Sequence, residues 1–123
     1  MIRDVTIGKD DVRKVVVGEK QVLTLIAGPC AIESEEHSLK MAGAILEITD
    51  KLGIQYVFKS CYNKDCRSSI KSFHGIGLER GLEILQKVRS TYHIPVTSDV
   101  SNIEWMQDTA RVVDLIQIPA YLS

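Results

Sequence analysis

Four short apolar segments, separated by stretches of helical periodicity, constrain the fold of this 123-residue chain more than any other feature. They cover residues 22–27, 54–59, 95–98 and 113–118. Runs this short and this apolar are typical of strands that are buried on both faces. Their alternation with helices implies an α/β fold with a parallel sheet and right-handed crossovers.

Three helices are predicted between these strands. The first begins after Ser34, a good N-cap residue, and ends at Gly53, which suits a left-handed C-cap. Apolar residues at helical spacing place the second at roughly 77–91. Ser101 and Glu104 have the spacing of a capping box and predict the start of a short third helix.

Before this alternation, residues 3–7 and 12–17 predict an antiparallel β-hairpin around the turn at residues 8–11. The order after the hairpin is βαβαβαβ, which fits two architectures. One is an open doubly wound sheet, and the other is part of a (β/α)8 barrel. Periodicity alone does not choose between them.

Charge and hydropathy exclude several classes of partner. Fifteen basic and sixteen acidic side chains give a net charge of -1, so we expect neither nucleic-acid nor membrane binding. No apolar run approaches the roughly 20 residues of a spanning helix, and residues 1–9 do not have the pattern of a signal peptide. Three cysteines without a C-x-x-C pair argue against a disulfide framework or a zinc finger. The sequence therefore predicts a cytoplasmic protein.

Polar residues gather where the predicted strands end, which is the active-site end in both architectures. The loop after the second strand carries Lys59, Lys64 and Arg67 among several hydroxyl groups, and this mixture suits phosphate and carboxylate oxygens. A solvated basic loop is the alternative interpretation. Cys30 is either a soft metal ligand or a packed thiol. Asp99 is either a helix cap or an acceptor for a sugar hydroxyl.

Several blocks, taken in order, resemble the 3-deoxy-manno-octulosonate 8-phosphate synthases. They are residues 27–34, 58–60, Lys64, 67–70, 72–75, 77–79 and 114–120. The segment Arg67-Ser68-Ser69 favours this family over the related 3-deoxy-arabino-heptulosonate 7-phosphate synthases, which remain a third interpretation.

The resemblance implies an aldolase-type TIM barrel of which this chain is a single partial domain. Residues 1–20 would form the hairpin, and residues 21–123 about half of the (β/α)8 barrel. The implied enzyme joins phosphoenolpyruvate to arabinose 5-phosphate in an aldol-type condensation that releases phosphate, for the synthesis of lipopolysaccharide precursors. The resemblance also implies a homo-oligomer at full length.

The resemblance assigns a role to each matching residue. Cys30 would bind a divalent metal ion, with the other ligands beyond Ser123. Lys59 and Lys64 would be catalytic and would meet the phosphoenolpyruvate carboxylate and the region of the sugar aldehyde. The rest of the expected substrate-binding set falls into a phosphate clamp, residues near the sugar hydroxyls, and residues beside both substrates: Ser60, Cys66, Arg67, Ser68, Asp99, Gln117, Pro119 and Ala120.

The chain departs from the family pattern at Cys61, Cys66, His74 and Ser101, and it is shorter than the roughly 250 residues of a complete barrel. We therefore expect these 123 residues alone to be inactive. A truncated, non-catalytic relative that serves as an assembly or phosphate-binding module is the competing interpretation.

Overall fold

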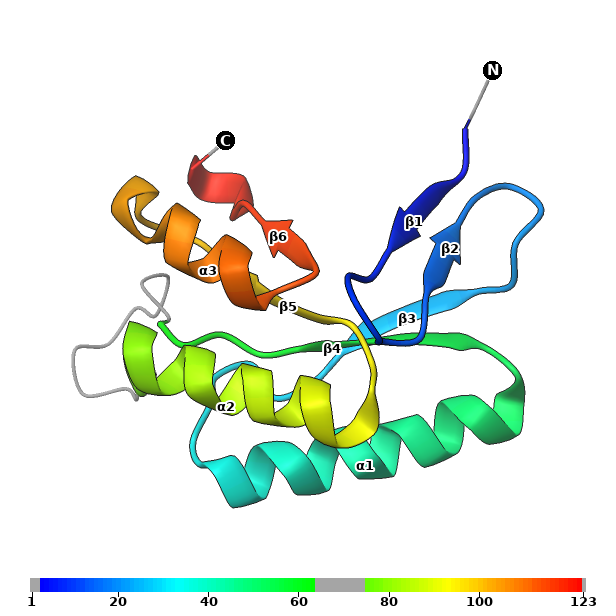
Figure 1. Ribbon diagram of the computed structural model, residues 1–123, viewed down its shortest axis with the longest axis horizontal. Coiled ribbons are helices and arrows are strands. Elements are labelled where there is room, and N and C mark those ends of the chain that lie inside the picture. The colour runs from blue at the N-terminus through cyan, green and yellow to red at the C-terminus, as the bar shows by residue number, and fades with distance from the viewer. Residues whose placement is uncertain (1–2, 64–74, 123) are drawn as a thin grey trace.

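A computed structural model describes residues 3–63 and 75–122, which form a two-stranded hairpin and a four-stranded parallel sheet with helices (Figure 1). The hairpin strands are β1 (Val5–Ile7) and β2 (Val15–Val17), and they are antiparallel. The sheet contains β3 (Thr24–Ala27), β4 (Gln55–Lys59), β5 (Val96–Asp99) and β6 (Leu115–Gln117), in the order of the sequence. The predicted hairpin and α/β alternation are confirmed.

The helices lie between the strands as predicted. They are α1 (Glu35–Leu52), α2 (Leu78–Tyr92) and α3 (Met106–Val112), with 3-10 turns η1 (Ile103–Trp105) and η2 (Ala120–Leu122). The Ser34 hydroxyl caps α1, and Gly53 ends it in the left-handed region with φ of 66°. No helix in the described ranges is both long and apolar enough to cross a membrane.

The predicted N-cap of the third helical segment is wrong by one residue. The segment starts at η1, where the side chain of Asn102 accepts a hydrogen bond from the backbone of Glu104. Asn and Ser cap helices about equally well. The backbone conformation after β5 therefore decides whether Ser101 or Asn102 is the cap. That conformation cannot be predicted from the spacing of Ser101 and Glu104 alone.

The main core lies between the sheet and the helices. Alternate residues of the strands, such as Tyr56, Phe58 and Val96, are buried against Leu85 and Val88 of α2 and against α1. Because strand side chains alternate between faces, the intervening residues point to the opposite side of the sheet. We call these two sides the helix face and the hairpin face.

The hairpin packs against the hairpin face at the edge where the strands begin. Ile7 and Val15 form a second buried cluster with Val57 of β4, and Leu115 packs against it. The side-chain amide of Gln55 accepts a hydrogen bond from the Val16 amide at 2.7 Å and donates to the Val16 carbonyl at 2.8 Å. The amide of Gln55 therefore pairs with β2 much as a strand backbone would. In Figure 1 the hairpin stands at the right, and the strands run away from it toward the left.

A buried ion pair connects the hairpin, α2 and the sheet. The Asp114 carboxylate is 0% exposed and accepts two hydrogen bonds of 3.0 Å from Arg89, whose side chain is 7% exposed. The backbone amides of Lys9 and Val96 donate to the same carboxylate at 2.8 and 3.0 Å. Arg89 also donates to the Lys9 carbonyl. Burial alone would raise the pKa of Asp114, but these hydrogen bonds and the guanidinium charge hold it below its ordinary value.

We predict that Asp114→Asn lowers the free energy of unfolding by about 3–5 kcal/mol, because the buried guanidinium of Arg89 loses its counter-charge. Urea denaturation measures this change. The matched control is Asp50→Asn, which breaks the exposed ion pair with Arg13 and should cost less than about 1 kcal/mol. Equal losses in the two variants would contradict the assignment.

The same pair predicts sensitivity to acid. The folded pKa of Asp114 is lowered, so its contribution is complete above the unfolded pKa of about 3.9 and is lost as the pH falls through the folded pKa. Denaturation curves from pH 6 down to about pH 2 should therefore show less acid destabilisation in Asp114→Asn than in the unsubstituted chain. Parallel curves would argue against this role of the pair.

Candidate active site

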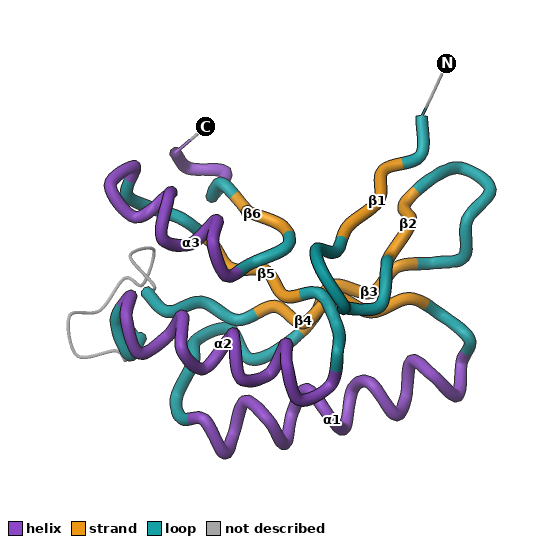
Figure 2. Tube along the Cα trace, viewed as in Figure 1, coloured by secondary structure: helices purple, strands orange, loops and turns teal. Residues whose placement is uncertain are grey.

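The carboxyl ends of all four sheet strands meet at one edge, opposite the hairpin (Figure 2). Lys59, Asp99 and Gln117 are the last residues of β4, β5 and β6, and Cys30 lies three residues beyond β3. This edge therefore collects a thiol, an ammonium, a carboxylate and an amide from four separate segments of the sequence.

Lys59 and Asp99 are neighbours on the hairpin face. Lys59 follows Val57 by two residues, so it shares the face on which Val57 contacts the hairpin. The ammonium of Lys59 lies 3.5 Å from the Asp99 carboxylate, and the two side chains are 28% and 14% exposed. Asp99 was expected to be either a helix cap or an acceptor for a sugar hydroxyl. In the structure its carboxylate forms an ion pair with Lys59. The ammonium side is the more accessible one, because the Asp99 oxygen that faces Lys59 is buried.

The segment that carries Cys30 is fastened to the end of β4. A β-carbon on Gly28 would overlap the backbone carbonyl of Lys59, so only glycine fits this approach. Ala31 forms a parallel bridge with Cys61, and the Ile32 amide donates to the Cys61 carbonyl at 3.0 Å. These contacts on both sides of Cys30 fix its backbone beside the carboxyl end of β4.

Ser60 also fastens this segment. Its side chain is buried, and its hydroxyl donates a 2.6 Å hydrogen bond to the Pro29 carbonyl. The backbone amide of Ser60 donates to the Thr97 carbonyl of β5 at 3.3 Å. In the structure, the hydroxyl of this predicted substrate-binding residue holds the Cys30 segment against β4.

Cys30 itself is exposed and is not in a disulfide, whereas Cys61 is buried. Exposure at the strand ends suits a thiolate ligand better than a packed core thiol. A metal ion needs more donors than this one. Within residues 3–63 and 75–122, no three His, Cys, Asp or Glu side chains are grouped to hold an ion. The residues present therefore fit one ligand position of a divalent ion and do not complete a site.

The last strand brings three predicted residues to the same edge. Gln117 is exposed, and its carbonyl accepts a 2.9 Å hydrogen bond from the amide of Val100. Pro119 is buried, and Ala120 begins the exposed turn η2. Lys64, Cys66, Arg67 and Ser68, together with His74, lie outside the described residues. The structure thus brings together seven predicted positions at this edge, and the predicted phosphate clamp lies outside the described residues.

One residue of this edge was not among the predicted ones. Thr97 is the partner of Lys59 in the ladder between β4 and β5, so it lies on the hairpin face next to the lysine. The signal was present, since Thr97 precedes Asp99 by the two residues that return a strand to the same face.

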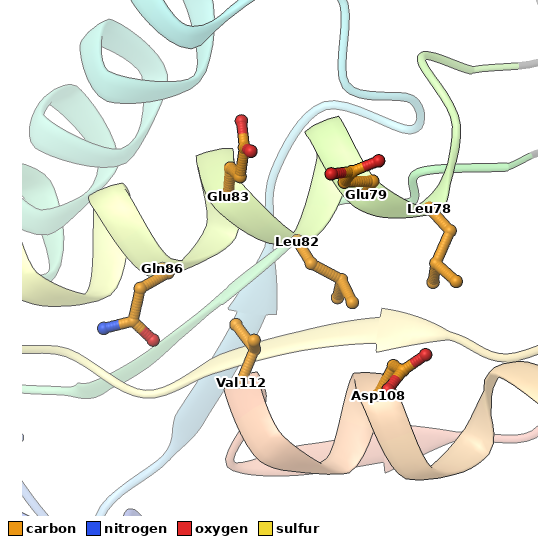
Figure 3. Close-up of a pocket in the computed structure, with 7 residues that line it drawn as sticks. All are labelled: Leu78, Glu79, Leu82, Glu83, Gln86, Asp108 and Val112. Carbon is orange, nitrogen blue, oxygen red and sulfur yellow. The ribbon is translucent and has the colours of Figure 1, made fainter.

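A groove of about 550 Å³ lies between α2 and α3 (Figure 3). Its floor is apolar, with Leu78 and Leu82 pointing toward α3, and its rim carries Glu83 and Asp108. Both carboxylates are paired with arginines of their own helices. The groove belongs to the helix layer and takes no residue from the strand ends, so it is separate from the candidate site.

Comparison with known proteins shows which proteins this chain resembles. Residues 4–123 match the sequence model of the DAHP synthetase I family. Similar curated proteins carry the name 2-dehydro-3-deoxyphosphooctonate aldolase. The protein of Hydrogenovibrio crunogenus is 51% identical over 106 residues, which are 86% of this chain and 38% of that protein. The protein of Rickettsia typhi is 46% identical over 106 residues, 86% of this chain and 39% of that protein.

The protein of Fusobacterium nucleatum matches a longer stretch, 44% identical over 122 residues, which are 99% of this chain and 43% of that protein. Across these three relatives, the chain therefore spans only 38% to 43% of the protein that it matches.

We predict that Gly28→Ala lowers the free energy of unfolding by about 1–3 kcal/mol, because the new methyl group meets a backbone carbonyl that cannot turn aside. The matched control is Gly18→Ala, whose methyl group meets the flexible, exposed side chain of Asp4. That variant should change the free energy by less than about 0.5 kcal/mol in the same urea titration. If the control lost as much as Gly28→Ala, the close approach to Lys59 would not be the cause.

Proposed function

This chain belongs to the DAHP synthetase I family, and from that premise we propose that its parent protein condenses phosphoenolpyruvate with arabinose 5-phosphate. The product would be a 3-deoxy-octulosonate 8-phosphate. The observation that carries the proposal is the name shared by the similar proteins at 44% to 51% identity. A phosphooctonate has eight carbons, which are the sum of a three-carbon enolpyruvate and a five-carbon sugar.

The balance of the reaction defines what the site must do. A bond forms between C3 of phosphoenolpyruvate and the aldehyde carbon of the sugar, while one water adds to C2 and inorganic phosphate leaves. The site must therefore hold two phosphorylated anions and expose an aldehyde to a weak carbon nucleophile. Cationic and hydroxyl groups at one edge suit the first task, and fixed positions of both substrates suit the second.

The Lys59–Asp99 pair supports a division of labour between the two substrates. We assign the ammonium of Lys59 to the phosphoenolpyruvate carboxylate, because an ammonium attracts a carboxylate and donates charge-assisted hydrogen bonds to it. We assign the carboxylate of Asp99 to hydroxyl groups of the sugar, which are donors. Because the two groups lie 3.5 Å apart, a substrate bound to one of them would lie next to a substrate bound to the other.

The remaining substrate residues are proposed from the resemblance. Lys64 would lie near the sugar aldehyde, and Arg67 and Ser68 would clamp the sugar phosphate, with Cys66 beside them. Gln117 would accompany Asp99 at the sugar hydroxyls. Pro119 and Ala120 would line the space beside both substrates. Ser60 would act by holding its segment of backbone.

We propose that Cys30 contributes one ligand to a divalent metal ion whose other ligands come from outside the described residues. A thiolate favours soft or borderline ions. When bound, such an ion polarises an aldehyde oxygen or orients a substrate. The residues of this chain hold the cysteine in place through Gly28 and the hydrogen bond from Ser60 to Pro29.

We further propose that the hairpin (residues 1–20) and residues 21–123 make one partial domain, about half of a (β/α)8 barrel. A consecutive parallel sheet with helices on one face supports this extent. The parent would be a cytoplasmic homo-oligomer that serves lipopolysaccharide precursor synthesis.

We predict that the full-length parent releases phosphate from phosphoenolpyruvate only when arabinose 5-phosphate is present, and that chelation abolishes this release until a divalent metal ion is restored. The 123-residue chain should give no turnover, because the residues that the structure describes supply one proposed metal ligand, Cys30, and no group of three. Erythrose 4-phosphate in place of arabinose 5-phosphate tests the heptulosonate branch. A parent that binds the sugar phosphate without turnover would instead support the non-catalytic module.

The division of labour gives a second prediction for the parent. Lys59→Met should raise the KM for phosphoenolpyruvate by about tenfold or more through loss of a charge-assisted hydrogen bond. Asp99→Asn should raise the KM for arabinose 5-phosphate in larger proportion than that for phosphoenolpyruvate. The control is Lys51→Met on the exposed surface of α1, where both constants should stay unchanged. Equal effects of each variant on both substrates would refute the assignment.

A further inference from the structure

Three glycines around the start of α2 lie against a single residue, Tyr62, which comes three residues after the end of β4. A β-carbon on Gly75 would overlap the Tyr62 carbonyl, and the φ of Gly75 is 122°, so only glycine fits there. The amide of Gly77 donates to the same carbonyl at 3.0 Å. A β-carbon on Gly81, in the first turn of α2, would overlap the β-carbon of Tyr62. Side chains at Gly75 or Gly81 would not allow this close packing.

Tyr62 is also held by the segment that follows β5. The residue is only 1% exposed. Its hydroxyl shares a 2.9 Å hydrogen bond with the hydroxyl of Thr109 in α3. Its ring meets Trp105 of η1 edge-on, with the ring centres 6.1 Å apart, an arrangement that aromatic pairs favour. Tyr62 therefore joins the end of β4 to α2, α3 and η1.

These contacts bring together two positions that are separated along the chain. Residues 64–74 lie outside the described residues, whereas Asn63 before them and Gly75 after them are described. A β-carbon on Gly75 would come within 3.0 Å of the Cα atom of Asn63. The stretch between these two ends carries the proposed sugar-phosphate clamp. Joining the ends of a segment restricts its conformations, and this lowers the entropy that a ligand must remove on binding.

We propose that Tyr62 is a positioning residue, which holds the two ends of residues 63–75 together beside β4 and thereby sets where the sugar phosphate binds. This inference rests on the proposed function. Lys59, assigned to phosphoenolpyruvate, lies three residues before Tyr62 and is held separately by the ladder between β4 and β5. A disturbance of the packing between Tyr62 and α2 should therefore affect the sugar phosphate more than phosphoenolpyruvate.

The test is Gly81→Ala in the full-length parent. The new methyl group pushes α2 away from Tyr62, so the two ends of residues 63–75 move apart. The KM for arabinose 5-phosphate should rise about tenfold, because small misplacements of binding groups are costly, and the KM for phosphoenolpyruvate should stay within about twofold. A milder variant, Tyr62→Phe, removes the hydrogen bond to Thr109 and should raise the KM for arabinose 5-phosphate about threefold. If Gly81→Ala does not fold, Tyr62→Phe decides the question.

The matched controls come from α1, which has a glycine and a tyrosine in the same relation on the helix face. A β-carbon on Gly43 would lie 2.6 Å from the hydroxyl oxygen of Tyr92, and this hydroxyl donates to the Leu39 carbonyl at 2.9 Å. Gly43→Ala and Tyr92→Phe should leave both KM values unchanged, whatever stability they lose in a urea titration.

Three outcomes overturn the role of Tyr62 alone. They are an unchanged KM for arabinose 5-phosphate in Gly81→Ala and Tyr62→Phe, an equal rise of both KM values in these variants, and an equal rise in the α1 controls. A parent with no turnover of phosphoenolpyruvate and arabinose 5-phosphate overturns the proposed function together with this inference.

Discussion

The carboxylate of Asp114 accepts four hydrogen bonds from three separate segments of the chain: the hairpin turn, α2 and the start of β5. Isolated charges are costly to bury, and this one is stable because Arg89 and two backbone amides surround it. The contact therefore does more than neutralise a charge. It sets the position of β6 relative to β5 and holds the hairpin against the strands. The spacing at the far end of these strands, where the site lies, depends on it.

The two ends of the sheet therefore have different roles: the amino ends stabilise the fold, and the carboxyl ends carry the candidate site. The amino ends are closed by the hairpin, through Gln55 and the cluster around Val57. The carboxyl ends leave Cys30, Lys59 and Gln117 at least partly open to solvent. Because the amino ends are tightly packed, the strands resist distortion. Charged groups at the carboxyl ends can then be held near one another, although partial burial costs them hydration free energy. The Lys59–Asp99 pair is an example of this arrangement.

Local signals predicted most of the fold, because the sheet follows the order of the chain. Ser34 and Gly53 cap opposite ends of α1, and each bonds only to residues within about one turn of itself. The sequence is enough to predict caps of this kind. Arg89 and Asp114 are 25 residues apart, and a pattern of single residues does not show which charges meet. The same limit applies to the site. Strand ends predicted the edge, but only the register identified Thr97 as the neighbour of Lys59.

The order of the strands also bears on how the chain folds during synthesis. Each sheet strand pairs with the strand that precedes it, so every new helix and strand adds to a surface that is already formed. Contacts of short sequence separation form quickly, and domains tend to fold from the amino terminus as they emerge. The helix-face core can therefore close as soon as β6 has left the ribosome. Among the described residues, β3 and β6 are the edge strands of this sheet, and Ile26 of β3 is 43% exposed, so each edge leaves backbone groups available to a further strand.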